Sequence, residues 1–142
     1  MTNSFDLLDE IFERCVSDEE MISLLEINTE LTGDELLDEQ NLKVRREYQT
    51  ADVIEPQDTP FISVYFMHAE KSKKNYLVNV GDLYVDIYTH NMYEAGLISK
   101  AFRRIAKGLD VQPLLMYEGQ HYSGVTGVRK YRLIYNPLID GE

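Results

Sequence analysis

Hydrophobic positions recur at helical spacing near the start of the chain. Residues 5–15 predict a first helix, because their apolar side chains fall on one face. That face consists of Leu8, Ile11, Phe12 and Cys15. Ser17 and Glu20 then have the spacing of a capping box, in which each side chain satisfies a free backbone amide. They predict a second short helix that runs through Leu25.

Thr32 and Glu35 repeat this capping signature and predict a third helix over 33–40. The acidic residues in the first turns suit the positive end of a helix dipole. The next segment, 43–60, is polar, contains two prolines and has no clear period. We interpret it as a linker or an extended arm.

The pattern changes at residue 61 from helical to extended. FISVYFMH, residues 61–68, is rich in β-branched and aromatic residues, as strands are. The polar segment 69–75 predicts a hairpin loop, and 76–89 predicts a second, long strand. Its alternation shifts by one residue at Gly81 and Asp82, which predicts a β-bulge or a kink.

The clearest element is a helix from about Asn91 to Lys107. Asn91 can cap its start together with Glu94, and Gly108 predicts a left-handed cap at its end. One face carries Ala95, Ile98, Phe102, Ile105 and Leu109, and the opposite face carries Lys100, Arg103, Arg104 and Lys107. We expect Phe102 and Ile105 to be buried against a sheet and Arg103 and Arg104 to be exposed.

Two further strands, over 111–119 and 127–137, are joined by a glycine-rich loop at 118–127. The second half therefore reads β-β-α-β-β. The fold class is α+β: short N-terminal helices precede an antiparallel or mixed four-stranded sheet with one amphipathic helix packed on it. The N-terminal helices or neighbouring subunits would have to cover the second face of that sheet. We expect a single domain with three parts: an acidic helical segment at 1–42, the linker or arm at 43–60, and the sheet-and-helix core at 61–138.

Composition adds information about partners and compartment. The net charge of the 142 residues is −11. Residues 1–60 hold 17 acids and 4 bases, whereas residues 61–142 hold 8 acids and 10 bases. Such an acidic N-terminal part repels phosphate backbones or attracts a basic protein. No apolar run is long enough to span a membrane, the N-terminus does not resemble a signal peptide, and Cys15 is the lone cysteine, which is typical of a reducing compartment.

Candidate catalytic chemistry is sparse. His68, His90 and His121 lie in separate segments and have no metal-ligand spacing. Asp82 and Asp86 share one face of the predicted second strand, and such a pair can serve a metal-dependent nuclease. The ordinary reading is that both acids lie on a solvated strand face with Tyr84 and Tyr88. We therefore expect neither enzymatic activity nor a cofactor.

The segment VDIYTHNMYEAGLISKAFRRIAKGL joins a strand that ends in DIYTHN to an amphipathic helix, and a hairpin closing on GVRKYRLIYNP follows. Over residues 60–138 this order resembles the head–tail joining and tail-terminator proteins of long-tailed bacteriophages that infect Gram-positive hosts, and their prophage relatives. The resemblance implies a non-enzymatic ring, commonly hexameric, that joins the tail tube to the head connector while DNA passes through its lumen. It implies a virion location, with the host cytoplasm before assembly. The acidic N-terminal helices lie outside the resemblance and suggest an added partner-binding segment.

We therefore expect the partners to be further copies of the chain, the tail-tube protein and the head connector proteins. The candidate interface residues lie in the two loops that the sheet core needs least: Lys71, Lys73, Lys74, His121 and Tyr122. Two alternatives stay open. One is a metal-dependent nuclease or other DNA-processing enzyme that uses Asp82 and Asp86, and the other is an acidic adaptor that binds a basic protein.

Overall fold

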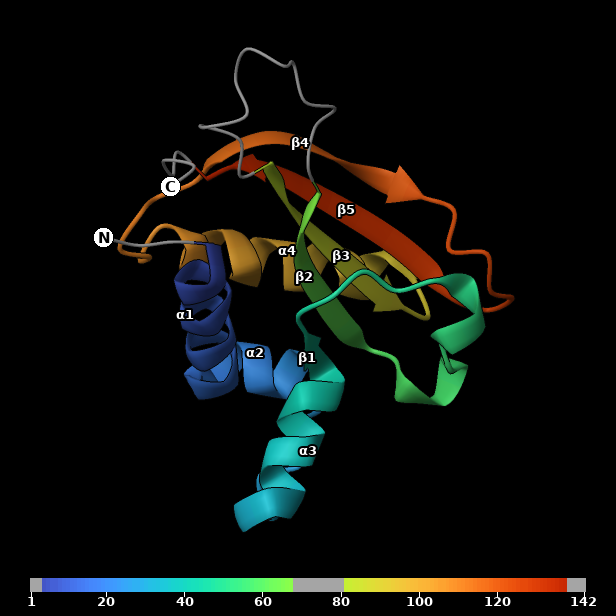
Figure 1. The fold of residues 1–142 in the computed structure, drawn as a ribbon. Coiled ribbons are helices and arrows are strands. Elements are labelled where there is room, and N and C mark those ends of the chain that lie inside the picture. Colours follow the sequence, from blue (N-terminus) through green and yellow to red (C-terminus); the bar gives the residue numbers. More distant parts are fainter. Residues whose placement is uncertain (1–3, 68–80, 138–142) are drawn as a thin grey trace.

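The protein has an α+β fold, in which helices pack on a five-stranded mixed sheet (Figure 1). The structure is a computed structural model, and it describes residues 4–67 and 81–137. The helices are α1 (Ser4–Ser17), α2 (Glu19–Leu24), α3 (Gly33–Lys43) and α4 (Met92–Ala106), with short 3-10 helices η1 (Ala51–Val53) and η2 (Pro56–Asp58). The strands are β1 (Val44–Arg45), β2 (Phe61–Met67), β3 (Asp82–Thr89), β4 (Leu114–His121) and β5 (Arg129–Asn136).

The strands lie in the order β1-β2-β3-β5-β4. β2, β3, β5 and β4 pair antiparallel with their neighbours, and β1 runs parallel to β2. The expected four-stranded sheet thus gains a fifth strand, because Val44 and Arg45 pair with Ile62 and Ser63. These two residues belong to the segment 43–60 that was interpreted as a linker or arm. The edges of the sheet are therefore the two-residue β1 and the eight-residue β4.

Helix α4 confirms the prediction from its hydrophobic period. Asn91 caps it by accepting a hydrogen bond of 2.9 Å from the backbone amide of Glu94. Phe102 and Ile105 are buried against the sheet, and Arg104 is exposed. Arg103 is only partly exposed, because its guanidinium turns toward β4 and pairs with Glu118 at 3.1 Å.

The end of α4 differs from the prediction. The capping residue Lys107 has a right-handed conformation, and the amide of Gly108 donates to the carbonyl of Ile105 at 2.9 Å. Gly108 is not among the residues with positive φ, so the predicted left-handed glycine cap is absent there. The next residue, Leu109, is buried as expected.

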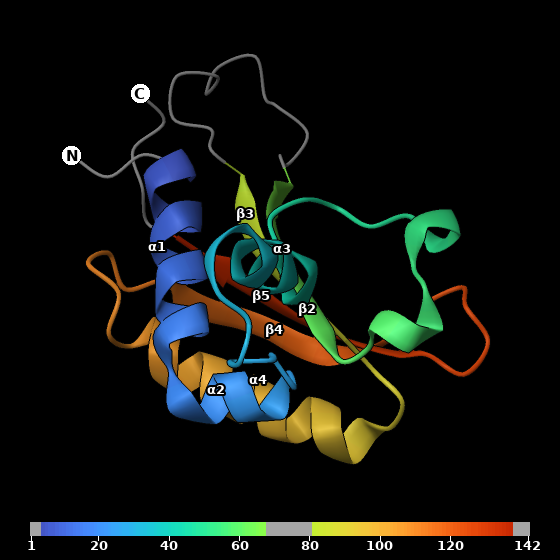
Figure 2. The same ribbon diagram turned by 90° about the horizontal axis from the view of Figure 1, so that it is seen from below.

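Helices α1, α2 and α4 all cover the same face of the sheet (Figures 1 and 2). Ile11 and Cys15 of α1 and Met21 of α2 belong to one apolar core with Phe102 and with Val85 of β3. The prediction that the N-terminal helices cover the second face of the sheet is therefore wrong. They fill the core under α4 instead.

The starts of α2 and α3 also differ from the predicted capping boxes. The residue that caps α2 is Asp18 and not Ser17, because the Asp18 carboxylate accepts from the amide of Met21 at 3.0 Å. Thr32 precedes α3 as expected, but its side chain makes no capping hydrogen bond.

The arm 46–60 covers part of the second face of the sheet. Ile54 from the arm, Phe61 from β2, Tyr88 from β3 and Val128 before β5 form a second, smaller apolar cluster there. The rings of Phe61 and Tyr88 stack with their centroids 4.8 Å apart. Tyr88 is therefore buried and does not lie on a solvated face as predicted.

The loop between β4 and β5 is shorter than predicted, and β4 is shifted toward the C-terminus. Residues 118–121, which were assigned to a loop, are the last four residues of β4, and they pair with β5 up to His121 and Lys130. The predicted loop 69–75 and residues 76–80 of the predicted second strand lie outside the described residues.

Candidate functional site

The second face of the sheet carries a buried ionic cluster centred on Asp86. The register places Asp86 of β3 opposite Arg132 of β5. Arg132 donates from Nε to Oδ1 of Asp86 at 2.7 Å, and Tyr65 donates from Oη to Oδ2 at 2.7 Å. Nζ of Lys130 lies 3.6 Å from the same carboxylate. The carboxylate is fully buried, so its charge is balanced by two cations and not by water.

The electrostatics of this cluster follow from burial. Burial lowers the pKa of Lys130, although Asp86 opposes that change. Burial also raises the pKa of Tyr65, and its hydrogen bond to Asp86 adds to the increase. Each charged member therefore has a partner, and the cluster serves to hold β2, β3 and β5 together.

This arrangement bears on the nuclease alternative. Both oxygens of Asp86 already accept hydrogen bonds from Arg132 and Tyr65, and Asp82 is only partly buried at the start of β3. The prediction that both acids lie on a solvated face is wrong for Asp86. Within residues 4–67 and 81–137, no group of three or more His, Cys, Asp or Glu side chains is placed to hold a metal ion.

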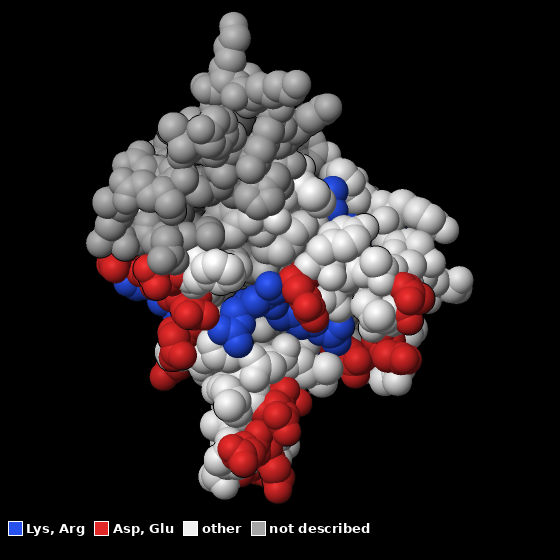
Figure 3. Space-filling view, in the orientation of Figure 1, with Lys and Arg blue, Asp and Glu red and all other residues white. Residues whose placement is uncertain are grey.

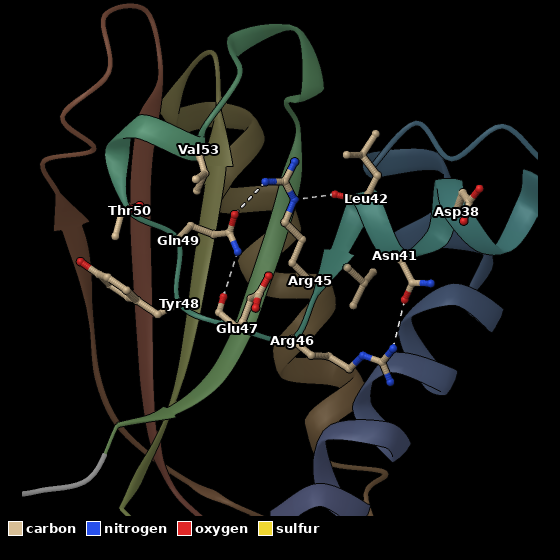
Figure 4. A pocket seen from close by; sticks show the side chains of 11 residues that line it. Asp38, Asn41, Leu42, Arg45, Arg46, Glu47, Tyr48, Gln49, Thr50 and Val53 are labelled. Carbon is tan, nitrogen blue, oxygen red and sulfur yellow. Dashed lines mark hydrogen bonds between the residues drawn. The ribbon is translucent and has the colours of Figure 1, made fainter.

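A hollow of about 780 Å³ lies beside β1, between the C-terminal end of α3 and the arm (Figure 4). Its floor is organised by Arg45, whose guanidinium donates to the carbonyl of Leu42 at 2.9 Å and to Oε1 of Gln49 at 2.8 Å. Arg46 donates to Oδ1 of Asn41 at 3.0 Å. The rim carries exposed apolar side chains, namely Leu42, Tyr48 and Val53. The hollow thus combines fixed guanidinium groups with uncovered apolar area.

A second uncovered apolar surface lies at the opposite edge of the sheet, along β4. Leu114 and Met116 are each 59% exposed, and Tyr117 is exposed beside them. A register shift between Leu115 and Tyr117 marks a bulge in this edge strand. Large apolar side chains on an exposed edge strand are a typical site for contact with another chain.

Three residues at alternate positions shape the end of β4. Tyr117 and His121 lie on the same face, and the Tyr117 hydroxyl is 3.2 Å from Nε2 of His121. Gly119 lies between them, and a Cβ at this position would be only 2.5 Å from the Tyr117 hydroxyl. Glycine therefore makes room for the tyrosine ring along the strand. Burial, followed by the charges of Arg132 and Lys130, lowers the pKa of His121.

The candidate interface residues from the sequence fall into two groups. His121 ends β4, and Tyr122 follows it with 91% of its surface exposed, so these two lie beside the apolar edge. Lys71, Lys73 and Lys74 lie outside the described residues. The predictions for all five as interface residues stay predictions.

The exposed apolar residues at both edges of the sheet were not predicted from the sequence. The run LLMY, residues 114–117, was assigned correctly to a strand, but an unbroken apolar run is typical of a strand buried on both faces and gave no sign of an exposed edge. No local pattern marks Leu42, Tyr48 and Val53 as neighbours, because only the path of the arm brings them together.

The part of the chain that the structure describes contains no helix long and apolar enough to cross a membrane. The chain matches no protein-family model, and no curated protein or solved structure is significantly similar to it. The functional assignment therefore rests on the residues and surfaces described above.

Proposed function

We propose that this protein is a structural component of a phage or prophage head–tail junction or tail terminator. In this role copies of the chain form a ring that joins the tail tube to the head connector. The observation that carries the proposal is the presence of uncovered apolar side chains at both edges of one sheet. They lie along β4 at one edge and around the β1 hollow at the other.

Two unlike surfaces on opposite edges suit a ring. In a head-to-tail contact one surface meets a different surface of the next copy, and the ring closes when the rotation between copies allows it. A two-fold dimer would instead use one surface twice. Leu114 and Met116 on β4 differ in shape and charge from the Arg45 and Tyr48 surroundings of the hollow. The two surfaces are therefore candidates for successive contacts around a ring.

The charge distribution agrees with DNA passing through such a ring. Figure 3 shows acidic side chains along α3 and the lower part of the molecule, with a band of basic side chains above them. The net charge of the chain is −11. An acidic protein surface repels a phosphate backbone, so DNA would slide past it without being held.

The experiment is complementation of the phage or prophage that encodes the chain, with its own gene deleted. The wild-type chain should restore joining of tails to heads, counted by electron microscopy. A Leu114→Glu, Met116→Glu variant should fold normally and fail to restore joining, because charge would be placed on the apolar edge. Gln112→Glu, an exposed change in the turn before β4, is the matched control and should restore it.

Two other outcomes would replace this proposal. If the deletion strain made tails of normal length that joined heads at the normal rate, the chain would have no role at the junction. A chain that remains a monomer in virions and captures a basic protein stoichiometrically would support the adaptor alternative.

A further inference from the structure

Helix α3 projects from the body of the protein (Figure 1), and each of its residues from Gly33 to Leu42 is exposed or partly exposed. Lys43, the last residue of α3, is buried, whereas Leu37 in the middle of the helix is 47% exposed. The C-terminal end is anchored, because Nζ of Lys43 donates to the carbonyls of Asp58 and Pro60 at 3.1 Å each. A helix of 11 residues has marginal stability in water without packing, so the outer part of α3 gains from a partner.

The exposed side of α3 is acidic around its leucine. Leu37 follows Asp34 by three positions and precedes Asn41 by four, so these residues share one side of the helix with the neighbouring Asp38. None of the residues from Glu30 to Leu42 is basic. A partner of α3 should therefore offer an apolar contact flanked by positive charge.

Helix α4 offers such a surface on the side that faces away from the sheet. Tyr93, which is 77% exposed, Leu97 and Lys100 follow one another at four and three positions and form a continuous outer stripe with Gly96. The stripe is uncovered in the structure, although the opposite side of α4 is buried in the core.

Two details of this stripe point to a close neighbour. Gly96 lies in the middle of a helix, where glycine costs about 1 kcal/mol relative to alanine, and an added Cβ there would meet nothing within 4 Å. A glycine in such a position permits close approach of another backbone. Arg103 and Arg104 are already paired with Glu118, Asp18 and Glu20, whereas Lys100 has no ion-pair partner among the described residues.

We propose that α3 of one copy packs across the outer stripe of α4 of a second copy. Leu37 would lie against Leu97 and Tyr93, and Asp34 and Asp38 would face Lys100. The occupant is a second copy because the two surfaces are complementary in charge and both lack a cover in the same chain. Since they are different surfaces, the contact repeats head to tail. The inference rests on the ring of the proposed function and identifies one of its contacts.

Disulfide cross-linking tests the contact directly. Leu37→Cys and Leu97→Cys are made in separate chains and mixed at high protein concentration under oxidising conditions. The native Cys15 does not interfere, because it is fully buried and burial, with the nearby Asp18 charge, raises its pKa to about 12. The mixture should give a cross-linked pair of copies, and a chain with both changes should give a ladder of higher species.

A matched control places the first cysteine elsewhere. Glu55→Cys, an exposed position at the start of η2, should not cross-link to Leu97→Cys above background. Lys100→Glu in the Leu97→Cys chain should slow cross-linking by about tenfold or more, because it puts like charges together. Asp34→Lys with Asp38→Lys in the Leu37→Cys chain should then restore the rate.

Failure of this contact is distinguishable from failure of the proposed function. Sedimentation could show that wild-type copies form a ring while Leu37→Cys and Leu97→Cys cross-link no faster than the control. In that case the α3–α4 contact is wrong and the ring stands. If the cross-link and its charge rescue are observed but the chain has no role in joining heads to tails, the contact stands and the function is wrong. Monomers that never cross-link would overturn the contact.

Discussion

Nε of Arg132 donates a hydrogen bond of 2.7 Å to Oδ1 of Asp86, whose carboxylate is fully buried. The same carboxylate lies 3.6 Å from Nζ of Lys130, so one acid balances two largely buried bases. Removal of one member of a buried ion pair is costly because it leaves the other charge without compensation. The cluster is therefore a sensitive point of the fold.

Asp86→Asn should lower the free energy of unfolding by about 3–5 kcal/mol, measured by urea denaturation. Asp82→Asn, four residues earlier on the same strand, should change it by less than about 0.5 kcal/mol, because Asp82 is only partly buried. Equal effects of the two changes would contradict the structural role of Asp86. Magnesium- or manganese-dependent DNA cleavage that either change abolishes would revive the nuclease alternative.

Two tyrosines on the same face should respond differently to loss of their hydroxyl group. Tyr65→Phe removes the hydrogen bond of 2.7 Å to Asp86 and should cost about 1.5–3 kcal/mol, because the acceptor is charged. Tyr88→Phe should be neutral or stabilising, since the buried Tyr88 hydroxyl has no hydrogen-bond partner within the described ranges. Thermal and urea melts of both variants make the comparison. A larger loss in Tyr88→Phe than in Tyr65→Phe would contradict it.

Stability should fall at alkaline pH. Burial raises the pKa values of Tyr65, Tyr88 and Tyr135 above the value of about 10 for an unfolded tyrosine. The unfolded chain therefore releases these protons first, so their stabilising contribution is complete below about pH 10 and is lost as the pH rises further. Lys43 and Lys130 have lowered pKa values and act in the opposite direction, but only up to the unfolded lysine pKa of about 10.4.

Urea melts at about pH 8 and about pH 11 measure this loss. Tyrosine absorbance during an alkaline titration should show a fraction of the tyrosines ionising late and together with unfolding. Tyr135→Phe should reduce the dependence of stability on pH above about pH 10. An unchanged dependence would exclude Tyr135 as a contributor.

Phe102→Ala should lower the free energy of unfolding by about 3–5 kcal/mol, because it removes a fully buried ring from the contact between α4 and the sheet. Lys100→Ala, two residues earlier on the exposed side of the same helix, is the control and should be close to neutral. A loss below about 1 kcal/mol for Phe102→Ala would be incompatible with the position of the ring in the core.

Duplex DNA should not bind tightly at physiological salt. Arg103 and Arg104 are paired with acids, and Arg132 and Lys130 are committed to Asp86, so few bases within residues 4–67 and 81–137 are available for phosphates. Fluorescence anisotropy with a labelled duplex should show no submicromolar, salt-sensitive binding. Submicromolar binding that weakens as the salt concentration rises would contradict this prediction.

Much of the fold could be predicted because several elements carry a local period. The apolar stripe that includes Phe102 defined α4, and the alternating run from Leu83 to Ile87 defined β3. β1 was missed because two residues are too few to show a period, and its pairing with Ile62 and Ser63 joins residues 18 positions apart. The order of the strands is likewise a property of the whole chain.

The candidate site was harder to predict because its features depend on neighbours in space. Asp86 looked like a solvated strand acid, but Tyr65, Lys130 and Arg132, which are distant in sequence, make its burial tolerable. His121 and Tyr122 were selected from a supposed loop, although His121 ends a strand at the sheet edge. Leu114 and Met116 are exposed because β4 is an edge strand of the sheet. The position of a strand in the sheet cannot be predicted from its local sequence.

The parallel pairing of β1 with β2 ties the segment that follows the N-terminal helices to the sheet. The acidic helices enter the core through α1 and α2, and the chain then adds Val44 to the sheet before the arm crosses the second face. Removal of residues 1–42 would take away α1 and α2, and with them the core contacts that Ile11, Cys15 and Met21 make beside Phe102 of α4. Helices α1 and α2 are therefore part of the same core as the sheet and not a detachable module.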